Sequence, residues 1–154
     1  MTVEAVLKNK GNAVFMTTPD AVIGDVVPRF KRNKAGSLIV IDQAGKVAGV
    51  LTERDIVNTL GEKGADILAL QVSAVMTKAK LKCRPEDSIA RALEIMGRSK
   101  TRYLPVVTSG RLIGVISMTD LVSAKLEEVQ ADNDWMMEYI SGDYSIAYEQ
   151  TPAD

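Results

Sequence analysis

Apolar residues recur along the chain in two closely similar series of short runs and helical spacings. Residues 18–42 align with 84–108, and residues 45–60 align with 110–125. Matching pairs include Pro19 with Pro85, Arg32 with Arg98, and Gly49 with Gly114. The alignment shifts by one residue in a predicted hairpin turn, where loop length varies at little cost. The chain therefore contains two copies of one structural unit.

Each copy predicts the element order β-α-β-β-α. A short strand, at 13–17 or 81–83, runs into a proline that cannot donate to a strand ladder. A helix follows, with helical apolar spacing at Ile89, Ala92, Leu93 and Met96 in the second copy. The runs 37–52 and 103–117 read as hairpins, because β-branched residues are dense on either side of a turn. A last helix is expected to begin at Thr52 or Ser117.

Other segments predict further helices and one irregularity. Pro28 lies about one turn inside the first helix, which we expect it to kink or shorten. The segment between the copies predicts a loop and then helical spacing at Ile67, Leu68, Leu70, Val72 and Val75. The last helix is expected to continue toward Trp135, and the tail from Ser141 to fray. These elements predict a mixed α+β fold, divided as 1–62, 63–126 and a C-terminal helix and tail at 127–154.

The composition is that of a soluble globular protein. Apolar residues make up 46% of the chain and charged residues 25%. The net charge of −1 gives no overall attraction to nucleic acid or to an anionic membrane. We find no signal peptide and no run long enough to span a membrane, so the expected location is the cytoplasm.

The chain lacks the residues that several common catalytic and metal-binding sites require. The chain has no histidine and a single cysteine, Cys83. This excludes a Ser-His-Asp triad, a histidine-based zinc site and a structural cysteine cluster. No glycine-rich phosphate loop of either common type occurs. We therefore expect neither a metal site nor a catalytic cofactor, and no enzymatic activity.

The candidate functional motif is Gly-x-x-[Thr/Ser]-x-x-Asp, present at 49–55 and at 114–120. Thr52 and Ser117 stand where a strand ends and a helix begins, a point where unpaired N–H groups and the helix dipole favour phosphate. Asp55 and Asp120 lie in the first turn, where a carboxylate can accept both hydroxyls of a ribose. The glycines allow close backbone approach. The alternative interpretation is a capping box that only seals each helix.

These features resemble the CBS (cystathionine β-synthase) domain family in its tandem form, the Bateman module. The resemblance covers roughly residues 5–125 and consists of an ordered set found twice: a strand into proline, an apolar hairpin strand and the motif above. Segments 6–11 and 135–140 also resemble small bacterial proteins made only of this pair. The resemblance implies two β-α-β-β-α domains packed with pseudo-twofold symmetry. It also implies clefts that bind AMP, ADP, ATP, NAD or, less readily, S-adenosylmethionine.

The resemblance also implies roles for individual residues. Asp55 and Asp120 would hold ribose hydroxyls, with Thr52, Ser117 and Thr119 beside them. The adenine would lie between the residues before the prolines (Thr17, Thr18, Cys83, Arg84) and a second wall (Tyr103, Leu104, Pro105, Val106). Arg54, Lys100 and Arg102 would contact phosphate. If one cleft alone is occupied, we expect the Asp120 cleft, because Arg102 replaces Gly36 of the first copy.

Each of these residues also has a structural interpretation. The hairpin residues can be core, Cys83 a small buried hydrophobe, and the basic residues solvated. The leading hypothesis is a regulatory, ligand-sensing homodimer that binds an adenine nucleotide and signals to an unidentified protein partner in trans. The alternative is a non-catalytic interaction or oligomerisation scaffold with vestigial clefts.

Overall fold

The computed structural model describes residues 1–11, 14–78 and 81–138. The first copy contains β1 (Met16–Thr17), α2 (Ile23–Asn33), β2 (Ser37–Ile41), β3 (Val47–Thr52) and α3 (Glu53–Lys63). The second contains α5 (Ile89–Ser99), β5 (Tyr103–Thr108), β6 (Arg111–Ser117) and α6 (Met118–Met137). Helix α1 (Val3–Lys10) precedes the first copy. The 3-10 helix η1 (Gly64–Ala69), α4 (Val72–Val75) and β4 (Thr77–Lys78) lie between the copies.

The predicted fold class is confirmed, since mixed helices and strands repeat in the expected order. The last helices begin as expected, with Thr52 and Ser117 as their N-caps. Helix α6 also continues through Trp135, as the apolar spacing predicted. Residue 13 of the first predicted strand and the tail from Ser141 lie outside the described residues.

Pro28 does not shorten the first copy's helix, so that part of the expectation was wrong. Helices α2 and α5 each have 11 residues. Each ends at a lysine in the left-handed conformation, Lys34 at φ 50° and Lys100 at φ 52°. The proline removes one helical N–H donor, but α2 buries Ile23 and Val26 against its copy's core. Tertiary packing of an apolar face therefore outweighs the local penalty.

The strand predicted at 81–83 was also wrong, because only Cys83 pairs there. The Cys83 N–H donates to the Pro105 carbonyl at 3.0 Å, and the Val107 N–H donates to the Cys83 carbonyl at 2.9 Å. In the first copy the corresponding ladder goes one step further, since the Ile39 N–H donates to the Phe15 carbonyl at 2.9 Å. Pro105 stands in the place of Ile39 and has no N–H. The ladder therefore ends at Cys83.

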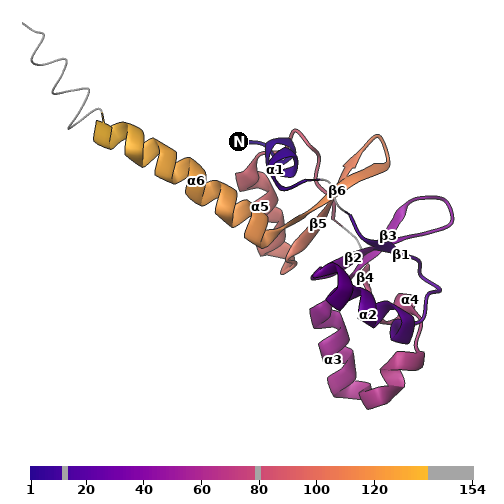
Figure 1. Ribbon diagram of the computed structural model, residues 1–154. Helices are drawn as coiled ribbons and strands as arrows, with labels where there is room; N and C mark the ends of the chain where they lie inside the picture. Colours follow the sequence, from indigo (N-terminus) through magenta and orange to yellow (C-terminus); the bar gives the residue numbers. More distant parts are fainter. Residues whose placement is uncertain (12–13, 79–80, 139–154) are drawn as a thin grey trace, which may run out of the picture.

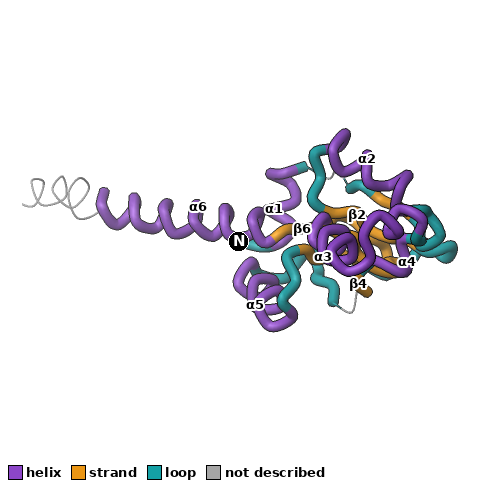
Figure 2. The backbone as a smooth tube through the Cα atoms, turned by 90° about the horizontal axis from the view of Figure 1, so that it is seen from below, coloured by secondary structure: helices purple, strands orange, loops and turns teal. Residues whose placement is uncertain are grey.

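The strands form two sheets between two groups of helices. One sheet has the order β1-β2-β3-β4, with β1 parallel to β2 and the other pairs antiparallel. The other sheet is the antiparallel hairpin β5-β6. Helices α1 and α5 lie at one end of the molecule and α2, α3 and α4 at the other, with the hairpins between them (Figures 1 and 2). The starts of α3 and α6 therefore face the middle of the molecule.

Each copy's hydrophobic core is completed by the segment that precedes the other copy. Val3, Val6 and Leu7 of α1 are buried in the cluster of the second copy. Ile67 of η1 and Val72 and Val75 of α4 are buried in the cluster of the first copy. The predicted domain boundary between residues 62 and 63 stays a prediction. Each of the two cores includes residues of the segment that precedes the other copy. As a result, the end of α1 lies beside the start of α6, and β4 lies beside the start of α3.

Helix α6 extends beyond the rest of the molecule (Figures 1 and 2). Its first turns are anchored by Leu121 and Ala124 in the core of the second copy. Within the described residues, none of the helices combines the length and the apolar character that a membrane crossing needs.

Candidate functional site

Both aspartates of the repeated motif form capping boxes. The Thr52 N–H donates to Asp55 Oδ2 at 2.9 Å, and the Asp55 N–H donates to Thr52 Oγ1 at 3.1 Å. Ser117 and Asp120 repeat this exchange at 2.9 and 3.0 Å. The capping boxes that the alternative interpretation predicted are therefore present in both copies. Because an ionised carboxylate has about four acceptor positions, a capping bond does not prevent it from holding a ligand as well.

Two features expected to admit a ligand are instead used by the protein itself. The N–H groups of Glu53 and Met118 donate to the Gly36 and Arg102 carbonyls, at 3.2 and 2.8 Å. These two N–H groups are thus paired within the chain, and the expectation of unpaired N–H groups for phosphate was wrong for Glu53 and Met118. Fewer N–H groups therefore remain for a phosphate at either helix start.

The motif glycines also make room for the chain rather than for a ligand. A Cβ on Gly49 would lie 2.6 Å from the Thr77 carbonyl oxygen, because β4 pairs with β3 there. A Cβ on Gly114 would lie 3.0 Å from a methyl group of Leu7 in α1. Both glycines therefore permit the close packing of the segment that precedes the other copy, and this corrects the interpretation made from the motif.

A cavity of about 890 Å³ lies between the start of α3 and the start of β5. This volume is within the range of small-molecule sites. We call it the Asp55 cavity. Of the predicted site residues, the lining includes Thr52, Arg54, Asp55, Lys100, Arg102, Tyr103, Leu104 and Pro105. The cavity therefore joins the helix start of one copy to the hairpin of the other.

The lining of the Asp55 cavity combines an apolar wall with an excess of positive charge. Its basic residues are Arg54, Lys78, Lys100 and Arg102, and its acidic residues are Glu53 and Asp55. Its apolar residues are Val50, Leu81, Leu104 and Pro105. A flat apolar group can pack on such a wall while an anionic group meets the basic side chains. Asp55 lies among these groups and can accept hydroxyl hydrogens.

Asp55 receives one further hydrogen bond inside the cavity. The Thr77 hydroxyl donates to Asp55 Oδ1 at 3.0 Å. A hydroxyl is both donor and acceptor and can rotate, so a ligand hydroxyl could replace or share this bond.

We define the Asp120 site as Ser117, Asp120 and Lys10. Its aspartate is contacted by a lysine ammonium, where Asp55 is contacted by a threonine hydroxyl. Lys10 Nζ lies 2.6 Å from Asp120 Oδ2 and 3.0 Å from the Val115 carbonyl oxygen. Burial of the Asp120 carboxylate raises its pKa, but hydrogen bonds from Lys10 and Ser117 outweigh burial and leave the pKa below its ordinary value. The Asp120 carboxylate is thus ion-paired with Lys10 of the same chain. The expectation that the Asp120 cleft is the occupied one stays a prediction, and the Lys10–Asp120 pair is a reason to prefer the Asp55 cavity.

Tyr103 lies between the two helix starts. Burial raises the pKa of its hydroxyl, and the carboxylates of Glu53 and Asp120 raise it further, so it stays protonated. A Cβ on Gly36 would collide with this hydroxyl. The glycine that stands where the second copy has Arg102 is therefore needed to admit the tyrosine ring from the other copy.

The remaining predicted residues lie outside the lining of the Asp55 cavity. Thr17 and Val106 are buried, and Thr18, Arg84 and Thr119 are exposed. Cys83 is buried in the core of the second copy, and burial raises the pKa of its thiol to about 12. Its backbone N–H and carbonyl are both used by β5. Cys83 therefore behaves as a small core residue.

Sequence reasoning missed part of the lining. The missed residues are Gly36, Val50, Glu53, Asn58, Thr77, Lys78, Leu81, Ser99 and Thr101. Asn58 had a signal, since it follows Asp55 by one turn on the same helix face. Thr77 and Lys78 had none, because they belong to a segment outside the aligned repeats.

Comparison with known proteins identifies the family. The model of the CBS domain matches residues 12–62 and 72–127. The chain belongs to the CBS-domain family. The two copies are therefore its two CBS domains, and the resemblance inferred from the repeated motifs is confirmed.

Related proteins span most of the chain. The mitochondrial CBS domain-containing protein CBSX3 of Arabidopsis thaliana is 28% identical over 152 residues, which cover 93% of this chain and 73% of the relative. The CBS-domain protein ATU1752 of Agrobacterium tumefaciens has 36% identity and a TM-score of 0.76, covering 80% of this chain and 92% of that one. CBSX2, solved in complex with AMP, has 26% identity and a TM-score of 0.64, covering 82% and 96%.

Proposed function

We propose that this protein is a regulatory module that binds one adenine nucleotide per chain in the Asp55 cavity. The observation that carries the proposal is the joining of Asp55 to four basic side chains and an apolar wall in one cavity of about 890 Å³. An adenine would pack on the apolar wall and the ribose hydroxyls would donate to Asp55. The structure of CBSX2 with AMP supports this ligand class.

The charge of the lining favours phosphate-bearing ligands. Four basic residues against two acidic ones favour AMP, ADP, ATP or NAD. The same excess disfavours S-adenosylmethionine, whose sulfonium group is positively charged. We propose no catalytic cofactor and no catalytic step, because the sequence lacks histidine and the motifs of nucleotide-hydrolysing enzymes.

The biological output we propose is a signal to another protein. Nucleotide occupancy would join the start of α3 to the hairpin of the second CBS domain and so couple the two domains. We propose that a homodimer carries this change and that a protein partner in trans detects it. The cytoplasmic location stays a prediction from the composition.

Calorimetric titration and thermal melting together test the ligand class. A ligand that binds only the native state stabilises it by about 2.7 kcal/mol at a hundredfold excess over Kd. For a chain of this length we expect AMP, ADP, ATP or NAD to raise the melting temperature by about 5–10 °C. Titration should give one site per chain, and S-adenosylmethionine serves as the charge control.

The competing function is a scaffold with vestigial clefts. The two capping boxes support it, since they give each aspartate a structural role that needs no ligand. No melting shift with any of the four nucleotides at millimolar concentration would establish the scaffold interpretation. A shift of similar size with S-adenosylmethionine alone would overturn the choice of a phosphate-bearing ligand.

A further inference from the structure

Helix α6 has two apolar faces, and its own chain buries one of them. Leu121 and Ala124 face the second CBS domain and are 0% and 7% exposed. Large apolar residues stay exposed on the same helix: Val122 at 43%, Leu126 at 64%, Val129 at 52% and Met136 at 53%, together with Trp135 at 63% and Met137 at 56%. The first four share a direction that lies, on average, about a third of a turn away from Leu121 and Ala124 around the helix axis.

The exposed set follows the spacing of a helix that pairs with another helix. Val122, Leu126, Val129 and Met136, with Asn133 between the last two, are separated alternately by four and three residues. This alternation forms one straight stripe along a helix and is the pattern of paired helices. A single asparagine in such a stripe is common where register must be specified. We call these five residues the α6 stripe.

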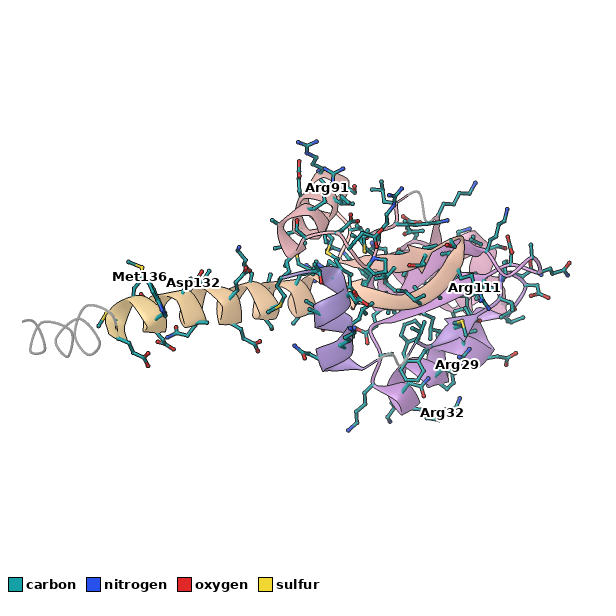
Figure 3. All side chains as sticks on the ribbon, turned by 90° about the horizontal axis from the view of Figure 1, so that it is seen from above. Arg29, Arg32, Arg91, Arg111, Asp132 and Met136 are labelled. Atoms are coloured by element: carbon teal, nitrogen blue, oxygen red, sulfur yellow. The ribbon has the colours of Figure 1, made fainter. Side chains whose placement is uncertain are left out.

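The outer part of the α6 stripe lies well away from the CBS domains. Met136, and Asp132 beside the stripe, are on the portion of the helix that extends from the rest of the molecule (Figure 3). Large apolar side chains exposed in a row are costly in water and indicate an interaction surface.

Charge identifies the occupant of the stripe. Lys125 and Asp132 each come directly before a stripe residue, Leu126 and Asn133 respectively. Within its own helix Lys125 Nζ lies 3.5 Å from Glu128 Oε2. When two α6 helices pair antiparallel with Leu126 against Val129 of the second copy, Lys125 also lies beside Asp132 of that copy. Twofold symmetry creates the same opposite-charge contact twice. A parallel pair in register would instead set Lys125 beside an uncharged Gln130.

Other occupants fit the charges less well. The outer helix also carries Glu127, Glu128, Asp134 and Glu138. This acidic surface would repel nucleic acid or an anionic membrane. A pair of α6 helices leaves these acidic side chains in solvent, because they lie off the stripe.

We propose that the α6 stripe packs antiparallel against the α6 stripe of a second copy of this chain. The inference rests on the proposed homodimer and is independent of nucleotide binding. The antiparallel arrangement puts the two pairs of CBS domains at opposite ends of the helix pair.

Light scattering with Leu126→Glu tests the stripe, and Ala131→Glu is the matched control, since Ala131 is exposed on another face of α6. We expect the wild type and Ala131→Glu to have about twice the 16.7 kDa of one chain, and Leu126→Glu to have the mass of one chain. Circular dichroism and AMP titration should show that Leu126→Glu is folded. A dimer that survives Leu126→Glu overturns the stripe. A monomeric wild type at 100 µM overturns the dimer as well, and neither result bears on the Asp55 cavity.

A charge exchange tests the antiparallel register. Lys125→Asp and Asp132→Lys should each weaken dimerisation about 2- to 30-fold, as expected for the loss of two exposed ion pairs. The double variant should return to within about threefold of the wild type, because both contacts form again with the charges reversed. A double variant no better than the single ones overturns the antiparallel arrangement.

Discussion

The two CBS domains carry the same capping aspartate, but different groups approach its other side. The Thr77 hydroxyl from β4 donates to Asp55 at 3.0 Å. The Lys10 ammonium from α1 donates to Asp120 at 2.6 Å. The hydroxyl brings no charge to Asp55, whereas the ammonium forms an ion pair with Asp120. One motif thus gives an anion available to a ligand in the first domain and an internally paired anion in the second.

A repeated sequence motif therefore does not guarantee that the surroundings of the motif are also repeated. The groups that distinguish the two aspartates come from segments that precede the aligned repeats, which begin only at residues 18 and 84. The crossed packing of α1 and β4 delivers them. The domains are therefore similar in their caps and different in the groups that contact the capping aspartates.

The largest effect on stability should come from the motif glycines. Gly49→Ala places a methyl group against the backbone of β4, which cannot move without breaking its ladder, so we expect a loss of about 3 kcal/mol. Gly114→Ala meets only the end of the Leu7 side chain, and we expect about 1 kcal/mol. Urea melts of both variants measure the difference. Equal losses of unfolding free energy would show that β4 against Gly49 and α1 against Gly114 tolerate an added methyl group equally.

The Lys10–Asp120 ion pair should contribute less. The two side chains are 28% and 24% exposed, so solvent weakens the pair only in part. We expect Lys10→Met to lower the free energy of unfolding by about 1 kcal/mol, and Thr77→Val by about 0.5 kcal/mol. Lys8→Met is the control, because Lys8 forms an exposed pair with Glu4 on the same helix. A loss in Lys8→Met as large as in Lys10→Met would remove the distinction between the two lysines.

Stability against pH should show the smallest effect. The pKa of Asp120 in the folded protein lies below the ordinary value of 3.8, so the carboxylate stabilises the fold above that value. The contribution is lost as pH falls through the lowered pKa. The stability difference between the wild type and Lys10→Met should therefore be constant from about pH 7 to 5 and shrink below about pH 4. Urea melts at each pH measure it, and a difference that grows at low pH would contradict the ion pair.

The sequence predicted the elements that local chemistry determines. Thr52 and Ser117 cap their helices as expected, because capping depends on residues three positions apart. The strand at 81–83 failed because its partner Pro105 lacks an N–H, a fact visible only once the pairing is known. Lys10 could not be connected to Asp120, since 110 residues separate them and α1 lies outside the aligned repeats. Tertiary packing decided these points.

We propose that Asp55 binds the nucleotide and that Asp120 does not. Asp55→Asn and Asp120→Asn make the same change in matching capping boxes, so each is the control for the other, and urea melts confirm that both fold. By calorimetric titration with AMP, Asp55→Asn should raise Kd about 10- to 150-fold, through the loss of charge-assisted bonds to two hydroxyls. Asp120→Asn should leave Kd within about threefold. A large loss confined to Asp120→Asn, or unchanged affinity in both variants, would contradict this assignment.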